Sequence, residues 1–170
     1  MVDWSNEAEC LEVVKQDVWA LKYVYNQTEE ICLEAVKHYG WALHYVKNQT
    51  EEICLAAVKQ HGWALRFVEN QTEEICSAAV KECGRSLEYV AAQNDEICIA
   101  AVKRWGGALY FVKNQTEEIC LNAVKQDGRA LQYVRDPTKE MMLVTCDNGE
   151  CALRICHSSI CLKYKEIWNG

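Results

Sequence analysis

The chain has 170 residues, 50% of them hydrophobic, and a formal net charge of -7. This acidic balance argues against nonspecific binding to nucleic acid or to an anionic membrane surface, because both reward lysine and arginine. No stretch approaches the roughly 18 apolar residues needed to span a bilayer, and the amino-terminal segment MVDWSNEAEC lacks the features of a secretory signal. We therefore expect a cytoplasmic protein whose partner is neither nucleic acid nor a membrane but another protein with a basic surface.

A short repeat, about 22 residues long, dominates the sequence from residue 6 to residue 137. Its clearest marker is a cysteine that recurs at the same position in every repeat: Cys10, Cys32, Cys54, Cys76, Cys98 and Cys120. Short repeats of constant length stack into arrays whose core is made by contacts between neighbours. Adjacent helix layers lie about 8–10 Å apart, which is too far for a disulfide, so we expect these cysteines to be reduced and buried.

Each repeat predicts two short helices. In residues 28–49, Thr28 stands at the expected N-cap, and two glutamates in the first turn complement the helix dipole. Apolar residues then recur at helical spacing as far as Tyr39, and Gly40 is expected to end the helix as the residue just past its last turn. Residues 41–47 predict a second helix of two turns.

One aromatic residue recurs in every second helix, and we expect this row to fill gaps between the layers of the core: Tyr23, Tyr45, Phe67, Tyr89, Phe111 and Tyr133. Two stacked helices per repeat predict an all-α fold, a right-handed-type α-solenoid of short αα repeats. We expect residues 1–170 to form a single monomeric domain, because no composition shift marks a boundary before about residue 140.

The repeat pattern weakens in residues 138–170. Thr138 and the following Glu140 to Leu143 stand in register with a first helix, which favours a degenerate seventh repeat followed by a C-terminal cap. The alternative is a β-hairpin in residues 143–155, with its turn at Asp-Asn-Gly. Four cysteines recur here every five residues, and for them core filling is favoured over a zinc site or a redox disulfide: Cys146, Cys151, Cys156 and Cys161. We expect no metal and no cofactor.

The motif EEICLAAVKQHGWALRFV, residues 51–68, combines an acidic helix start, an apolar run ending in Ala-Val-Lys-Gln, and Gly-x-Ala-Leu-x-aromatic. It resembles the short αα repeats of the family called domain of unknown function 4116. The resemblance covers residues 6–136 and implies a helical repeat. It implies no particular activity, and the cysteine in the first apolar pair and the tail depart from the family pattern.

Two surfaces could carry function. The first is an acidic ridge on the first turns of the first helices, which either serves the helix dipoles or mimics a phosphate backbone: Glu29, Glu30, Glu51, Glu52, Glu73, Glu74, Glu117 and Glu118. The second consists of positions near the second helix that differ between repeats and hold aromatic and basic residues, the types that anchor interfaces. From these positions we predict six partner-binding residues: Trp41, His44, Trp63, Arg66, Trp105 and Tyr110.

The sequence holds no Gly-rich phosphate loop, nucleophile elbow or His-Glu-x-x-His pattern. We therefore expect no catalytic residues, and a non-enzymatic repeat protein that binds a partner through its variable surface. The alternative is an acidic inhibitor, of the kind used in conflict between phage and bacteria, that places the ridge in the basic nucleic-acid channel of a nuclease or CRISPR-type effector.

Overall fold

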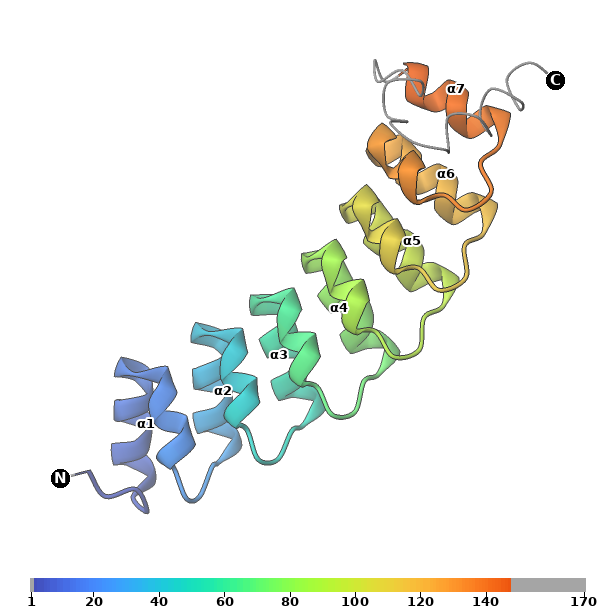
Figure 1. Cartoon of the computed structure of the whole chain (residues 1–170). Coiled ribbons are helices and arrows are strands. Elements are labelled where there is room, and N and C mark those ends of the chain that lie inside the picture. Colours follow the sequence, from blue (N-terminus) through green and yellow to red (C-terminus); the bar gives the residue numbers. More distant parts are fainter. Residues whose placement is uncertain (1, 148–170) are drawn as a thin grey trace. The chain divides into compact units, whose positions relative to one another are not determined.

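The computed structural model describes residues 2–147, and every regular element in that part of the chain is a helix (Figure 1). These helices divide between two compact units, with the boundary between Ala91 and Ala92. The predicted all-α repeat fold is confirmed, because the same order of helices recurs at a constant interval along the chain. That the whole chain behaves as a single domain stays a prediction.

Unit 1 contains four repeats, each an α-helix of 10 residues followed by a 3-10 helix of 6 residues. Its elements are α1 (Glu7–Gln16), η1 (Val18–Tyr23), α2 (Glu29–His38), η2 (Gly40–Tyr45), α3 (Glu51–Gln60), η3 (Gly62–Phe67), α4 (Glu73–Glu82) and η4 (Gly84–Tyr89). The described part of unit 2 contains α5 (Asp95–Arg104), η5 (Gly106–Phe111), α6 (Glu117–Gln126), η6 (Gly128–Tyr133) and α7 (Lys139–Asp147).

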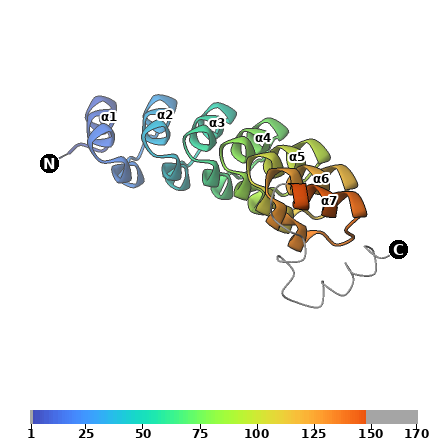
Figure 2. The ribbon, with the colours of Figure 1, turned by 90° about the horizontal axis from the view of Figure 1, so that it is seen from above.

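Within each unit the α-helices lie side by side in one layer and the 3-10 helices in a second layer (Figure 2). Within a unit, an α-helix also contacts the 3-10 helix of the repeat before it, as α3 does with η2 and α6 with η5. Helices this short are marginal alone in water, so this contact with neighbouring repeats supplies their stability.

The predicted helix starts are confirmed. The Thr28 hydroxyl accepts a hydrogen bond from the Ile31 N–H at 3.5 Å, and Thr50 and Asn94 cap their helices in the same way. Thr138 accepts from the Met141 N–H at 3.4 Å and so begins α7, as expected for a seventh repeat. Because residues 143–147 are helical, a β-hairpin strand in this segment is wrong. The proposed cap and Cys151, Cys156 and Cys161 lie outside the described residues.

The second helix of each repeat differs from the prediction because it is a 3-10 helix instead of two α-helical turns. Its bonds span three residues, as where the Ala42 N–H donates to the Tyr39 carbonyl at 2.8 Å. A segment of 6 residues can form few α-helical bonds, and the tighter 3-10 winding satisfies more of its backbone.

Gly40 does not end α2, as the sequence had indicated. The helix ends at His38, the extended Tyr39 follows with φ of -150°, and Gly40 begins η2. The reason for glycine is close approach to the next repeat, since a Cβ on Gly40 would lie 2.5 Å from the Ala57 carbonyl oxygen.

The core of each repeat is built from small and branched apolar residues. In the second repeat Ile31, Ala35 and Val36 of α2 are buried against Leu43 of η2 and its neighbours. The repeat cysteines are buried and free, as predicted. The aromatic row was wrongly assigned to the core: Tyr23 is 55% exposed, and Tyr45, Phe67, Tyr89, Phe111 and Tyr133 are half-buried at the surface of the 3-10 layer.

Across residues 2–147, each helix is too short or too polar to cross a membrane.

Candidate functional site

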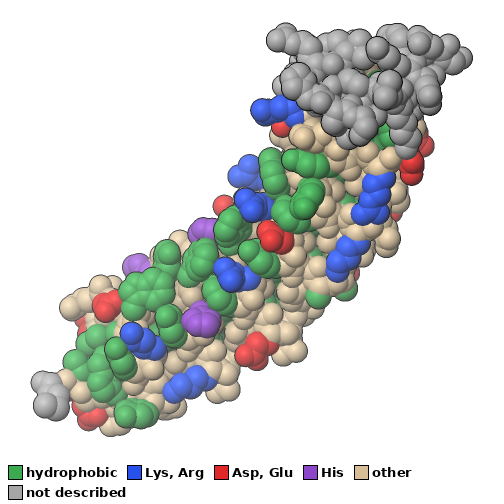
Figure 3. All heavy atoms as spheres, in the orientation of Figure 1, with side chains coloured by type: hydrophobic (Ala, Val, Ile, Leu, Met, Phe, Trp, Pro, Cys, Tyr) green, Lys and Arg blue, Asp and Glu red, His purple; other side chains and the backbone are tan. Residues whose placement is uncertain are grey.

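The outer surface of helices η1–η4, here called the 3-10 face of unit 1, carries a chain of aromatic contacts. Ring centroids lie 5.9 Å apart for Trp19 and Tyr45, 5.7 Å for Trp41 and Phe67, and 6.4 Å for Trp63 and Tyr89. In each of these pairs a tryptophan of one repeat meets the aromatic residue of the next. On this face hydrophobic side chains gather with Lys, Arg and His side chains among them (Figure 3).

Arg66 lies at the centre of this face and contacts three rings. Its guanidinium carbon is 5.2 Å from the centroid of Phe67, 5.7 Å from Tyr89 and 5.9 Å from Trp41. Cation–π attraction of this kind contributes roughly 0.5–1 kcal/mol at an exposed site. The three rings belong to successive repeats, so the arginine side chain is held across two repeat junctions while it remains exposed.

His44 and Trp63 occupy the same face. The exposed His44 ring lies 4.9 Å from the rings of both Tyr45 and Phe67. Trp63 is half-buried, and its indole N–H donates to the Cys83 sulfur at 3.1 Å. Four of the six predicted partner-binding residues, namely Trp41, His44, Trp63 and Arg66, therefore share one continuous surface in unit 1.

The other two predicted residues belong to unit 2. Tyr110, in η5, is 66% exposed, and Trp105, which immediately precedes η5, is 38% exposed. The Tyr110 ring lies 5.1 Å from Phe111 and 5.6 Å from Tyr133 of the next repeat. Unit 2 thus has its own smaller aromatic surface of the same construction.

The glutamates of the predicted acidic ridge are all exposed, but two of them, Glu29 and Glu51, also link repeats. In unit 1 the Thr50 hydroxyl donates to the Glu29 carboxylate at 2.9 Å, and Thr72 donates to Glu51 at the same distance. Each threonine therefore caps its own helix while bonding the previous one. These bonds between repeats explain the presence of Glu29 and Glu51 without any role in ligand binding.

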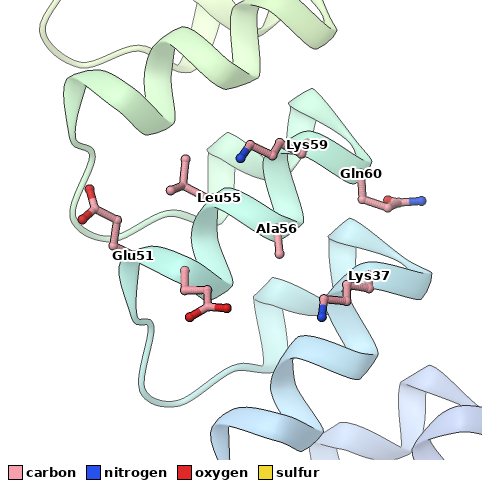
Figure 4. A pocket seen from close by; sticks show the side chains of 7 residues that line it. Lys37, Glu51, Leu55, Ala56, Lys59 and Gln60 are labelled. Atoms are coloured by element: carbon pink, nitrogen blue, oxygen red, sulfur yellow. The ribbon is translucent and has the colours of Figure 1, made fainter.

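Two of the second glutamates, Glu52 and Glu74, border open grooves between neighbouring α-helices. One groove, of about 700 Å³, is lined by Lys37 of α2 and by Glu52, Leu55 and Lys59 of α3, among others (Figure 4). An equivalent groove between α3 and α4 repeats this arrangement with Lys59, Glu74 and Lys81. Lysine thus lies near glutamate on this layer, so the ridge is not a surface of uniform negative charge.

Sequence reasoning missed a repeated glutamine. The Gln49 side-chain amide donates to the Phe67 carbonyl at 2.8 Å, and its oxygen accepts from the Glu69 N–H at 3.0 Å. Equivalent pairs of bonds, within one unit or the other, are made by Gln27, Gln71, Gln93 and Gln115. The signal was available, because a polar residue that does not vary between divergent repeats has a structural task in each of them.

The repeat cysteines are unsuited to redox or metal chemistry in the folded protein. Burial, followed by the charge of Glu29, raises the pKa of Cys32 to about 11, and burial likewise raises the pKa of Cys98 to about 11. Thiols that remain protonated are poor nucleophiles and ligands. No cluster of His, Cys, Asp or Glu within the described residues could hold a metal ion.

Residues 10–49, 28–72, 50–93 and 94–137 each match the sequence profile of one family, described as Domain of unknown function (DUF4116). The chain belongs to this family. The first three DUF4116 matches overlap and the fourth follows directly, so that together they span residues 10–137, and each covers about two successive repeats. No curated protein and no solved structure matches the chain, so the surfaces of this DUF4116 protein have to be interpreted from its own side chains.

Proposed function

We propose that this DUF4116 protein is a non-enzymatic binding protein that engages a partner protein through the 3-10 face of unit 1. The observation that carries the proposal is the Arg66 cluster, in which an exposed guanidinium is fixed by Trp41, Phe67 and Tyr89. Tryptophan, tyrosine and arginine are the residues that most often dominate the binding energy of protein interfaces.

The fixed geometry of these side chains favours binding. Ordering a mobile side chain at an interface costs roughly 0.5–1.5 kcal/mol. On this face Trp41, Trp63 and Arg66 already contact neighbouring rings, and Trp63 is further held by its bond to Cys83. A partner therefore meets side chains whose conformational freedom is already restricted.

The test is a pull-down from the native cell lysate with the full chain as bait, at low and at high salt. We expect a partner that remains bound at high salt to be lost when Trp41 and Trp63 are both replaced by alanine. The matched control is Leu33→Ala with Leu55→Ala, which removes half-buried apolar side chains from the α-helical layer. Circular dichroism checks that both variants stay helical, and a partner captured equally by both variants would overturn the proposal.

A second candidate function rests on the exposure of Glu30, Glu52 and Glu74 in unit 1. With these carboxylates the chain itself would act as an inhibitor, by occupying the basic nucleic-acid channel of a nuclease or CRISPR-type effector. Such binding would weaken steeply with salt and would be displaced by the enzyme's own nucleic acid. Replacing the three glutamates by glutamine would abolish it, whereas the two tryptophan substitutions would leave it intact.

We further propose a cytoplasmic location and a monomeric state. The seven cysteines whose side chains are described are all free, which suits a reducing compartment. Sedimentation of the reduced full chain would test the monomer, and fractionation of the source cells would test the compartment.

A further inference from the structure

Resting on the proposed function, we infer that the 3-10 face of unit 1 takes an acidic, proline-containing segment of its partner in an extended polyproline II conformation. In this arrangement the carboxylates of the segment meet Lys22, His44 and Arg66, which occupy the same position in three successive repeats. The net charge of the whole chain favours a basic partner, but the local charge of this face favours the opposite sign.

Arg66 is the strongest element of the argument. Three aromatic rings hold its side chain, and no carboxylate among residues 2–145 forms an ion pair with it. The ring contacts leave the guanidinium without an ion-pair partner among the described side chains, so its N–H groups remain for a ligand. Because these N–H groups form a rigid fork, a carboxylate accepting two of them is the natural partner.

The charge sequence along this row is specific. Lys22, His44, Arg66 and Glu88 are exposed at equivalent positions, so N–H donors occupy three repeats, with Lys22 and Arg66 as the cations among them, and a carboxylate occupies the fourth. The Lys22 ammonium rests 4.7 Å from the Tyr23 ring centroid, and Glu88 lies 3.7 Å from the Arg85 guanidinium. A complementary segment therefore carries three acidic residues followed or preceded by one basic residue.

Repeat spacing matches the geometry of polyproline II. Neighbouring helices in a layer lie about 8–10 Å apart, so equivalent side chains recur at about that distance. A polyproline II chain rises about 3.1 Å per residue and completes a turn in three, which places every third side chain on one side at intervals of about 9 Å. Carboxylates at every third position would therefore meet successive members of the row.

The aromatic residues beside the row suit proline better than nucleic-acid bases. Trp41 and Phe67 meet edge-on at an interplanar angle of 64°, and Trp63 and Tyr89 at 68°, which makes an apolar shelf of the kind that proline-rich segments use. A nucleic acid would bring its phosphate backbone to this face together with its bases. Glu88 and the net charge of -7 also repel phosphates.

The test uses the full chain and a fluorescent peptide, Glu-Pro-Thr-Glu-Pro-Thr-Glu-Pro-Thr-Lys, together with its reversed sequence, because the direction of the bound segment is open. We expect one of them to bind in an anisotropy titration about tenfold more tightly than the charge-swapped peptide Lys-Pro-Thr-Lys-Pro-Thr-Lys-Pro-Thr-Glu. Arg66→Glu should weaken binding of the acidic peptide about tenfold, and exchanging one peptide glutamate for lysine should restore it.

The matched control is Lys59→Glu, which makes the same charge change on the α-helical layer and should leave peptide affinity unchanged. Equal binding of the acidic and charge-swapped peptides would overturn the inference, as would tighter binding of oligodeoxythymidine. If neither peptide binds but the pull-down partner still depends on Trp41 and Trp63, the inference fails and the proposed function stands. If the partner is also insensitive to those tryptophans, both fail.

Discussion

The side-chain amide of Gln49 donates a hydrogen bond to the backbone carbonyl of Phe67, at 2.8 Å, and so joins one repeat to the next. Its oxygen accepts in turn from the Glu69 N–H, and the Cys54 thiol lies 3.6 Å from the same oxygen. Backbone groups of the turn after η3 are thus satisfied by the side chain of the preceding repeat. The same relationship recurs within both units, which makes glutamine a main connector of this fold.

Gln49→Ala should lower the free energy of unfolding by about 1–3 kcal/mol, because it leaves a backbone carbonyl and a backbone N–H of the next repeat without their partner. Urea unfolding followed by circular dichroism measures the change. The control is Asn48→Ala, an exposed neighbour in the same turn, whose effect should remain within about 0.5 kcal/mol. Equal losses for both variants would contradict the connecting role of Gln49.

Ser86→Ala should stabilise the protein by roughly 1 kcal/mol. The Ser86 hydroxyl is fully buried in η4 and has no hydrogen-bond partner among the described residues, whereas the equivalent residues Ala42 and Ala64 are apolar. The reciprocal variant Ala64→Ser places a hydroxyl at the same position of η3 and should destabilise by a similar amount. Urea midpoints that move the same way in both variants would refute this account.

Replacing either of the two adjacent glycines of η5, Gly106 and Gly107, by alanine should change the free energy of unfolding by different amounts. A Cβ on Gly106 would lie 2.7 Å from the backbone carbonyl oxygen of Ala123, which cannot move without displacing α6. The three atoms nearest to a Cβ on Gly107 all belong to the ring of Trp105, an exposed side chain that can rotate away. We therefore expect Gly106→Ala to cost about 1–3 kcal/mol and Gly107→Ala less than about 1 kcal/mol.

Urea unfolding of the two glycine variants gives the comparison, and a larger loss for Gly107→Ala would count against it. Val18 occupies the position of Gly106 in the first repeat, where η1 contacts η2 and α2 less extensively than the later helices contact one another. A side chain is therefore tolerated where the junction is wider, which is consistent with close approach as the reason for glycine elsewhere.

Stability should fall at alkaline pH because of the buried thiols. Burial raises the pKa of Cys32 and of Cys98 to about 11 in the folded protein, from an ordinary value near 9.0. The thiols therefore contribute full stability below pH 9, and this contribution is lost as the pH rises from about 9 to about 11, because only the unfolded chain can release these protons.

The measurement is the urea midpoint between about pH 8 and about pH 10.5, in reducing buffer. Cys32→Ala should show a shallower decline with pH than the unaltered chain, since it removes one of the shifted groups. Tyrosine and lysine titrate in the same range, so the difference between the two curves is the informative quantity. If the urea midpoints of the two proteins fell in parallel as the pH rises, Cys32 would have the same pKa in the folded and unfolded states, and the prediction would be wrong.

Local signals in the sequence predicted much of the fold. Thr28 and its equivalents were identified as caps because a cap depends on residues three positions away, and Cys32 was placed in the core because helical spacing defines a buried stripe. The second helices were predicted in position but not in type. Whether six residues wind as α-helix or 3-10 helix depends on the groups that satisfy their ends, and these include side chains of the next repeat.

The candidate site was predicted less completely. Trp41, His44, Trp63 and Arg66 were named from their variation between repeats, and the structure brings them together on one face of unit 1. Tyr45 and Phe67 were expected in the core because aromatic residues at helical spacing usually lie there. They are half-buried partners of that face, since the small residues of each repeat already fill the space between the layers.

The sequence by itself determined the repeat period, the all-α character, the helix starts and the buried stripe, because each depends on residues that lie close together within one repeat. Only the tertiary structure decided the connecting role of Gln49, the need for glycine at Gly40 and the exposure of Arg66 between three rings. These features depend on how closely the next repeat approaches, and that distance is set by the packing of side chains from separate repeats.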